Sequence, residues 1–108
     1  MTQTRIVLST AGSAEEAQKI AHALVERRLA ACVNVLGPMQ SVYRWKGAVE
    51  SAEEYLLVIK TTFAGFARVC DAIRELHSYE LPECILLPIE AGSEPYLKWI
   101  AESVSIAP

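Results

Sequence analysis

CVNVLGPMQSVYRWKGAVESAEEYLLVIKT, residues 32–61, decides the fold of this chain. The stretch predicts two long strands that fold back at Lys46-Gly47, because glycine readily supplies the positive φ of a tight turn. Residues 55–59 are apolar at every position, which is typical of a strand buried on both faces. Each arm exceeds the usual strand length of about five or six residues. We therefore expect a hairpin that overhangs its own sheet and needs a second copy of the chain to cover it.

The composition fits one globular domain over residues 1–108. Hydrophobic residues make up 52% of the chain, and we attribute this high share to an interface between copies. No apolar run approaches the roughly 18 residues of a spanning helix, and we expect neither a signal peptide nor a membrane partner. The net charge of -3 includes no basic block, which argues against nucleic-acid binding. Three cysteines without CxxC spacing indicate buried, reduced thiols in a cytoplasmic protein.

The N-terminal third predicts a strand, a helix and a second strand. Residues 5–10 form a short buried strand. Ser13 then caps a helix, and Glu16 reaches back to complete a capping box. The face of that helix that lies on the sheet is formed by Ala17, Ile20, Ala21, Leu24 and Arg28. Residues 29–36 form the second strand, and Gly37-Pro38 marks a bend or bulge.

The following segment predicts a second helix and a fourth strand. A hydroxyl of Thr61-Thr62 caps this helix, which ends near Ser78 because Leu81-Pro82 disfavours helical backbone. Its inner stripe is formed by Phe63, Phe66, Cys70, Ile73 and either Leu76 or His77. Residues 84–89 form the strand, in which Pro88 must lie at an edge or a bulge because it has no N–H to donate.

A short third helix completes the chain. Ser93 caps it, and its apolar stripe is formed by Tyr96, Leu97, Ile100 and Val104. The order is then β-α-β-β-α-β with a C-terminal helix, an α+β chain. Right-handed crossovers turn this order into a ferredoxin-like sandwich with two helices on one sheet face. The other face stays uncovered within one copy, so we expect a closed oligomer, a homotrimer whose long hairpins extend neighbouring sheets.

Three segments together resemble the CutA family of divalent-cation tolerance proteins. They are residues 29–35 (LAACVNV), 43–47 (YRWKG) and 77–83 (HSYELPE), and the resemblance extends from Val7 to Trp99. It implies a ferredoxin-like homotrimer related in architecture to the PII signalling proteins. It also implies binding of divalent cations, Cu(II) above all, and a role in tolerance to them. No organic cofactor is expected.

Residues 77–83 carry the metal-binding prediction. His77 at a helix end, followed by Glu80 and Glu83 around a proline turn, supplies the nitrogen and oxygen ligands that Cu(II) prefers. A second interpretation is that His77 caps the helix, where a cation suits the C-terminal dipole. Tyr79 and the two glutamates would then bind neighbouring backbone.

The family pattern is incomplete at three positions. Ser78 stands where the commonest pattern has proline. In relatives with a proposed copper site, a cysteine occupies the position of Ser9. Some relatives carry a further histidine at the position of Leu76. His77 is then the one strong ligand that matches. His22, among polar neighbours on the first helix, is interpreted as a solvated side chain.

Tyr43, Trp45 and Lys60 form a second candidate site. Cross-strand pairing and trimer symmetry would place the two rings and the ammonium near Tyr79 of a neighbouring copy. Such a cleft suits a small anion or a partner segment, by analogy with the PII proteins. The alternative is that Tyr43 and Trp45 are interface anchors.

Catalytic motifs are missing. The chain has no Ser-His-Asp grouping in recognisable order and no Gly-rich phosphate loop. The loop at residues 11–14 lacks the arginine that acylphosphatases of this fold need. The first strand also lacks the aromatic residues on which RNA-binding modules stack bases. We therefore predict a protein that is not an enzyme.

Overall fold

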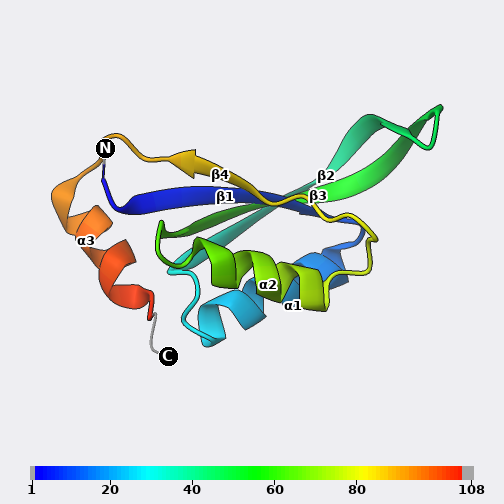
Figure 1. The fold of residues 1–108 in the computed structure, drawn as a ribbon. Helices are drawn as coiled ribbons and strands as arrows, with labels where there is room; N and C mark the ends of the chain where they lie inside the picture. The colour runs from blue at the N-terminus through cyan, green and yellow to red at the C-terminus, as the bar shows by residue number, and fades with distance from the viewer. Residues whose placement is uncertain (1, 106–108) are drawn as a thin grey trace.

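A four-stranded antiparallel sheet in the order β2-β3-β1-β4 forms one layer of the molecule (Figure 1). The computed structural model describes residues 2–105. The central strands are β1 (Thr4–Ala11) and β3 (Ala48–Thr62). The edge strands are β2 (Cys32–Trp45) and β4 (Ile85–Pro88). This order, with helices after β1 and β3, is the predicted ferredoxin-like sandwich.

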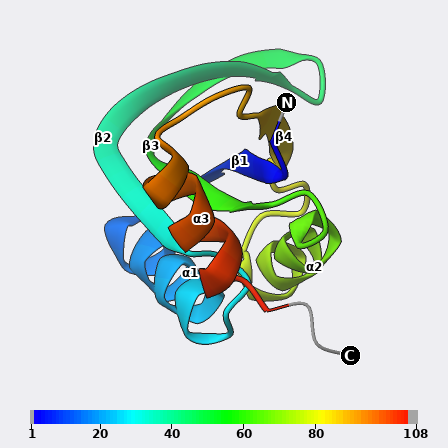
Figure 2. The same cartoon turned by 90° about the vertical axis from the view of Figure 1, so that its left-hand side faces the viewer.

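The second layer consists of two helices on one face of the sheet. These are α1 (Ala14–Glu26) and α2 (Phe66–Leu76), while α3 (Glu94–Ser103) lies at one end of the sheet (Figures 1 and 2). The core forms between these layers, and its fully buried larger side chains are Val7, Ile20, Leu24, Leu57, Ile59, Val69 and Ile73. No helix within residues 2–105 is long and apolar enough to cross a membrane.

The first helix agrees with the sequence prediction except at its two ends. Ser13 is the N-cap, and its Oγ accepts the N–H of Glu16 at 3.1 Å. The predicted inner residues Ala17, Ile20, Ala21 and Leu24 are buried. The prediction for Glu16 was wrong, because its Oε1 lies 3.4 Å from Nδ1 of His77 instead of reaching back to the N-cap. Arg28 lies past the helix end, exposed and with φ of 61°.

The start of the second helix differs from the prediction. β3 continues through Thr62, whose Oγ1 accepts the N–H of Gly65 at 3.1 Å, so this hydroxyl caps a turn rather than the helix. The helix begins only at Phe66. Phe63 therefore lies ahead of it and is 57% exposed. The buried helical positions are Val69, Ala72 and Ile73, so the predicted stripe was right only in part.

The strand β4 is shorter than predicted, and the start of α3 lacks the predicted side-chain cap. β4 spans four residues, and Pro88 ends it on an edge of the sheet as expected. Ser93 is the N-cap of α3, but its side chain makes no capping hydrogen bond. Ile100 is fully buried, whereas Tyr96 is exposed.

The β2–β3 hairpin is the longest feature, as the sequence predicted. Lys46 and Gly47 form the turn with φ of 49° and 83°. The predicted bulge lies at Gly37-Pro38, a cis peptide, where the register shifts between Leu36 and Met39. β1 pairs with β3 only from Tyr55 onward. Residues 39–54, called the hairpin overhang below, therefore pair with one another alone (Figure 1).

The sheet face turned away from α1 and α2 is apolar. Side chains alternate along a strand, so the neighbours of core residues Val7 and Leu57 point to this second face. The apolar residues of this open face are Ile6, Leu8, Leu56, Val58, Ile85 and Leu87, and the same face also carries Asn34 and Lys60. Ile85 and Leu87 are exposed, and the other four apolar residues are half-buried. Two helices thus leave this face largely without cover within one chain.

Candidate functional site

A groove of about 1100 Å³ lies between the hairpin overhang and residues 78–83. The end of β1 contributes Thr10 to its lining, and β3 contributes Leu56. The structure brings five predicted site residues together here, namely Tyr43, Trp45, Tyr79, Glu80 and Glu83. Parts of the two candidate sites of the sequence are therefore two walls of one groove, whereas His77 and Lys60 are not among its lining residues.

The groove is acidic. Glu50, Glu53 and Glu54 of β3 line it opposite Glu80 and Glu83, and no lysine or arginine is among the described lining residues. Burial raises the pKa of Glu83, and the nearby charge of Glu54 raises it further. Carboxylates that repel one another in a partly enclosed space favour a cationic ligand over an anionic one.

Tyr79 fixes residues 78–83 against the base of the overhang. Its hydroxyl donates to Oε2 of Glu54 at 2.7 Å. The pKa of Tyr79 is raised, first by burial and then by this hydrogen bond and the charge of Glu54. Gly12 leaves room for the ring, because a Cβ there would lie 2.9 Å from the Tyr79 hydroxyl oxygen. The position of Glu80 and Glu83 thus depends on a contact between distant parts of the chain.

The side chain of His77 lies behind the groove and is fully buried, and the backbone N–H of His77 donates to the Ile73 carbonyl at the end of α2. Its Nε2 donates to the Thr10 carbonyl at 2.5 Å, since a carbonyl oxygen only accepts. Its Nδ1 accepts the N–H of Tyr79 at 3.1 Å. Both ring nitrogens are therefore occupied, and the ring joins α2, β1 and the 78–83 segment. The helix cap in the second interpretation comes from the backbone of His77 rather than from its ring.

Lys60 lies away from the groove. The register places it opposite Cys32, whereas Tyr43 and Trp45 pair with Glu50 and Ala48. Its Nζ donates to Oδ1 of Asn34 at 2.7 Å. Cross-strand pairing within one chain therefore does not bring the ammonium to the two aromatic rings.

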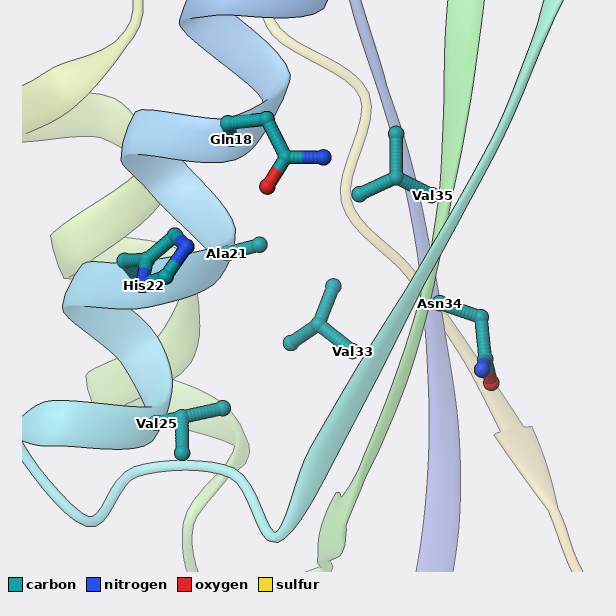
Figure 3. Close-up of a pocket in the computed structure, with 7 residues that line it drawn as sticks. All are labelled: Gln18, Ala21, His22, Val25, Val33, Asn34 and Val35. Carbon is teal, nitrogen blue, oxygen red and sulfur yellow. The ribbon is translucent and has the colours of Figure 1, made fainter.

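A second, smaller cavity of about 380 Å³ lies between α1 and β2. Val33 and Val35 point from β2 toward Ala21 of α1, whereas Asn34 points away (Figure 3). His22 lines the outer side of this cavity and is solvent-exposed, as predicted. Its walls are mostly apolar and bring no second metal-ligating side chain to His22.

Potential metal ligands are not clustered within residues 2–105. Within them, no group of three or more histidine, cysteine, aspartate or glutamate side chains converges as a ready metal site. Glu80 and Glu83 share the groove, but His77 does not line it. Glu54 was not predicted as a site residue, although it stands at the start of the apolar run of β3. The available signal was its position two residues before Leu56, which places both side chains on the same face of the strand.

Comparisons with known proteins agree on one family. A sequence model of the CutA1 divalent ion tolerance protein family matches residues 5–103. The divalent-cation tolerance protein CutA of Thermus thermophilus is 46% identical over 98 residues, covering 91% of this chain and 95% of that protein. Protein CutA of Homo sapiens is 47% identical over 92 residues, covering 82% of this chain. The match spans 51% of the human protein, so the chain corresponds to about half of that relative.

Solved structures give the same relationship. A divalent cation tolerance protein (Cut A1) from Thermus thermophilus superposes with a TM-score of 0.93 at 44% identity, covering 94% of this chain and 99% of that chain. A structure from Archaeoglobus fulgidus, described as a periplasmic divalent cation tolerance protein CutA, gives a TM-score of 0.91 at 41% identity. That match covers 94% of this chain and 99% of the other.

Proposed function

Because the chain belongs to the CutA1 divalent ion tolerance family, we propose that it is a non-enzymatic, homotrimeric protein that binds divalent cations, Cu(II) above all. The acidic groove is the observation that carries this proposal. Its cation site is residues 77–83, with Glu80 and Glu83 as oxygen ligands. The family description names tolerance to an ion and no reaction, which supports a binding role.

The Glu54–Glu83 pair gives the physical reason for cation binding. The charge of Glu54 disfavours ionisation of Glu83. A divalent cation between the groove carboxylates offsets this repulsion and favours the ionised form of both. Carboxylate oxygens suit several divalent ions, and Cu(II) also accepts them beside an imidazole nitrogen.

His77 enters this proposal as the nitrogen ligand, and it must exchange partners to do so. Its ring would leave the Thr10 carbonyl and the N–H of Tyr79, which it contacts in this structure. If the ring keeps these contacts, His77 instead positions Tyr79 and the carboxylates that follow it. The two roles predict different copper affinities for His77→Ala.

Assembly into a trimer is supported by two surfaces. The open face presents Ile85 and Leu87 to solvent in one chain, and the overhang exposes Val42 and Val49. Contiguous exposed apolar surface commonly marks a contact between proteins. In this assembly Tyr43 and Trp45 anchor neighbouring copies, and the groove becomes a cleft between them.

The alternative function is a PII-like cleft that takes a small anion or a partner segment. Lys60 would have to reach the cleft from a neighbouring copy, since one chain keeps it apart. The five carboxylates of the groove favour a cation in this place instead. Loss of phosphate or nucleotide binding in Lys60→Ala, with the assembly intact, would favour the alternative.

A cytoplasmic location is also proposed, from the three free cysteines within the described residues. One relative is described as periplasmic. Cell fractionation with a periplasmic marker distinguishes the two locations.

A Cu(II) titration of metal-stripped protein tests the metal proposal. Wild type should bind about one ion per chain, and Glu80→Gln/Glu83→Gln should lose about tenfold or more in affinity, because both charged ligands are removed. Glu26→Gln on the exposed surface of α1 is the matched control and should bind as wild type does. Wild-type affinity in the double variant would overturn the proposal. Wild-type affinity in a folded His77→Ala would leave His77 a positioning residue.

A further inference from the structure

The wall of the groove that the hairpin overhang forms carries two carboxylates that the proposed Cu(II) site does not use. Glu50 and Glu54 belong to β3, and both line the groove. They share one face of the strand and are separated by about 13 Å along it. Carboxylates this far apart do not bind one small ion together, so this wall suits a longer ligand with more than one positive charge.

The inner end of this wall offers an unused hydrogen-bond acceptor. Only 9% of Glu54 is exposed. One of its carboxylate oxygens, Oε2, accepts the Tyr79 hydroxyl at 2.7 Å. The other oxygen, Oε1, accepts no hydrogen bond from any residue that the structure describes, and Glu54 turns toward the groove that it lines. A buried carboxylate with an unused oxygen is stabilised by a cationic donor that enters the groove.

The outer end of the wall combines a carboxylate with an aromatic ring. The register places Glu50 directly opposite Tyr43, and both side chains line the groove. Tyr43 is 41% exposed, so its ring is open to a ligand. An alkylammonium group can pack against such a ring while its N–H groups donate to the carboxylate. The neighbouring ring of Trp45 already has a cation beside it, because Nζ of Lys46 lies 5.6 Å from its centroid.

Small side chains lie between the two ends of the wall. Ser41 and Ala52 pair across the hairpin between the levels of Glu50 and Glu54. Both also line the groove. Residues of this size leave room for a narrow chain of methylene groups that runs from one carboxylate to the other.

We propose that the overhang wall of the groove binds an aliphatic polyamine such as spermidine. One terminal ammonium donates to Oε1 of Glu54, and the other lies between the carboxylate of Glu50 and the ring of Tyr43. The methylene chain lies over the small residues between them. This inference rests on the proposed cation-binding role of the groove and adds a second class of cation. It uses neither Glu80 nor Glu83 as a contact, although their charges on the facing wall also attract a polycation.

Isothermal titration calorimetry of metal-stripped protein with spermidine tests the site. We expect saturable binding of about one spermidine per chain in wild type. Glu50→Gln should lose about tenfold in affinity, because it removes a charge-assisted hydrogen bond. Glu26→Gln on the exposed surface of α1 is the matched control and should bind as wild type does. The absence of saturable binding to wild type, or an affinity of Glu50→Gln within twofold of wild type, would overturn the proposal.

A pair of matched ligands keeps the test independent of how the variants fold. Diaminooctane carries an ammonium at each end of a chain as long as that of spermidine, and octanediol carries a hydroxyl at each of the same ends. Wild type should bind diaminooctane and should not bind octanediol. Equal binding of the two would show that apolar contact alone holds the chain, which overturns the role of the carboxylates.

The Cu(II) titration separates this inference from the proposed function. Glu80→Gln/Glu83→Gln should lose Cu(II) affinity but should bind spermidine more tightly than Glu50→Gln does. Spermidine binding without Cu(II) binding in wild type would overturn only the proposed metal site. Cu(II) binding without spermidine binding would overturn only the present inference.

Discussion

The two halves of the β2–β3 hairpin are built in the same way but are covered differently. In the inner half, residues 32–36 pair with 56–60, and Leu57 and Ile59 are fully buried under the helices. In the overhang, Val42 is 70% exposed and Val49 is 66% exposed. The ladder hydrogen bonds continue through both halves, so pairing alone does not decide burial. The elements packed against each half do, and they leave the overhang available for a ligand and for other copies.

Truncation of a core residue in the inner half should have the largest effect. We expect Leu57→Ala to lower the free energy of unfolding by about 3 kcal/mol, because the cavity lies between two packed layers. Val49→Ala in the overhang is the comparison and should cost clearly less, about 1 kcal/mol, because only a neighbouring copy can cover this side chain. Urea denaturation measures both. Equal losses would show that the overhang is packed as tightly as the core, which contradicts the comparison.

The junction between the halves should be the next most sensitive place. Gly37 has φ of +151°, and an added Cβ would lie 2.7 Å from the Tyr55 ring. We expect Gly37→Ala to cost about 2 kcal/mol through strain and overpacking. Gly47 at the turn has φ of +83° with no atom within 4 Å of an added Cβ, so Gly47→Ala should cost only about 1 kcal/mol. The reverse order in thermal denaturation would mean that the bulge can rearrange.

The contact that ties the groove to the base of the overhang should contribute less. Tyr79→Phe leaves the buried Glu54 carboxylate without its donor, so we expect a loss of about 1.5 kcal/mol at neutral pH. Tyr96→Phe on α3, where the ring is exposed, should change little. Because the pKa of Tyr79 is raised, the folded state keeps this proton when the unfolded chain loses it near pH 10.

Wild-type stability should therefore fall above pH 10, and the decline should be shallower in Tyr79→Phe. Chemical denaturation at pH 8, 10 and 11 compares the two proteins. Parallel declines would show that the Tyr79 hydroxyl does not face the Glu54 carboxylate in solution.

The smallest expected effect is a gain. Glu83 has a raised pKa, so the folded state retains its proton above the usual pKa of 4.5, and stability falls as pH rises through that window. Glu83→Gln removes this penalty and should raise the melting temperature at pH 7. Below pH 4.5 Glu83 is protonated in both states, and the difference between variant and wild type should vanish. A variant that is less stable than wild type at pH 7 would contradict the crowding of charges in the groove.

Local signals in the sequence predicted much of this structure. The glycine of the turn, the Ser13 cap and the apolar face of α1 each depend on residues close in sequence. The start of α2 was missed because Thr62 had two uses for its hydroxyl, and the turn at Gly65 took it. Propensity does not distinguish a capped turn from a capped helix.

The candidate site was predictable only in its parts. Residue types indicated Tyr43 and Trp45, and separately Glu80 and Glu83, but the sequence prediction brought the two sets together only across neighbouring copies and not in one groove of one chain. The contacts of His77 with Thr10 and Glu16 join residues more than 60 positions apart. Such contacts follow from how α1, α2 and β1 pack, which no local pattern encodes.

The mass of the protein in solution tests the central claim most directly, namely that other copies of the chain cover the overhang and the open face. Light scattering on metal-stripped wild type at micromolar concentration should give three times the mass of one chain. Val42→Asp/Val49→Asp, at the exposed overhang, should shift the population toward lower mass, while Lys19→Ala on α1 should not. A wild-type mass equal to one chain would contradict the account.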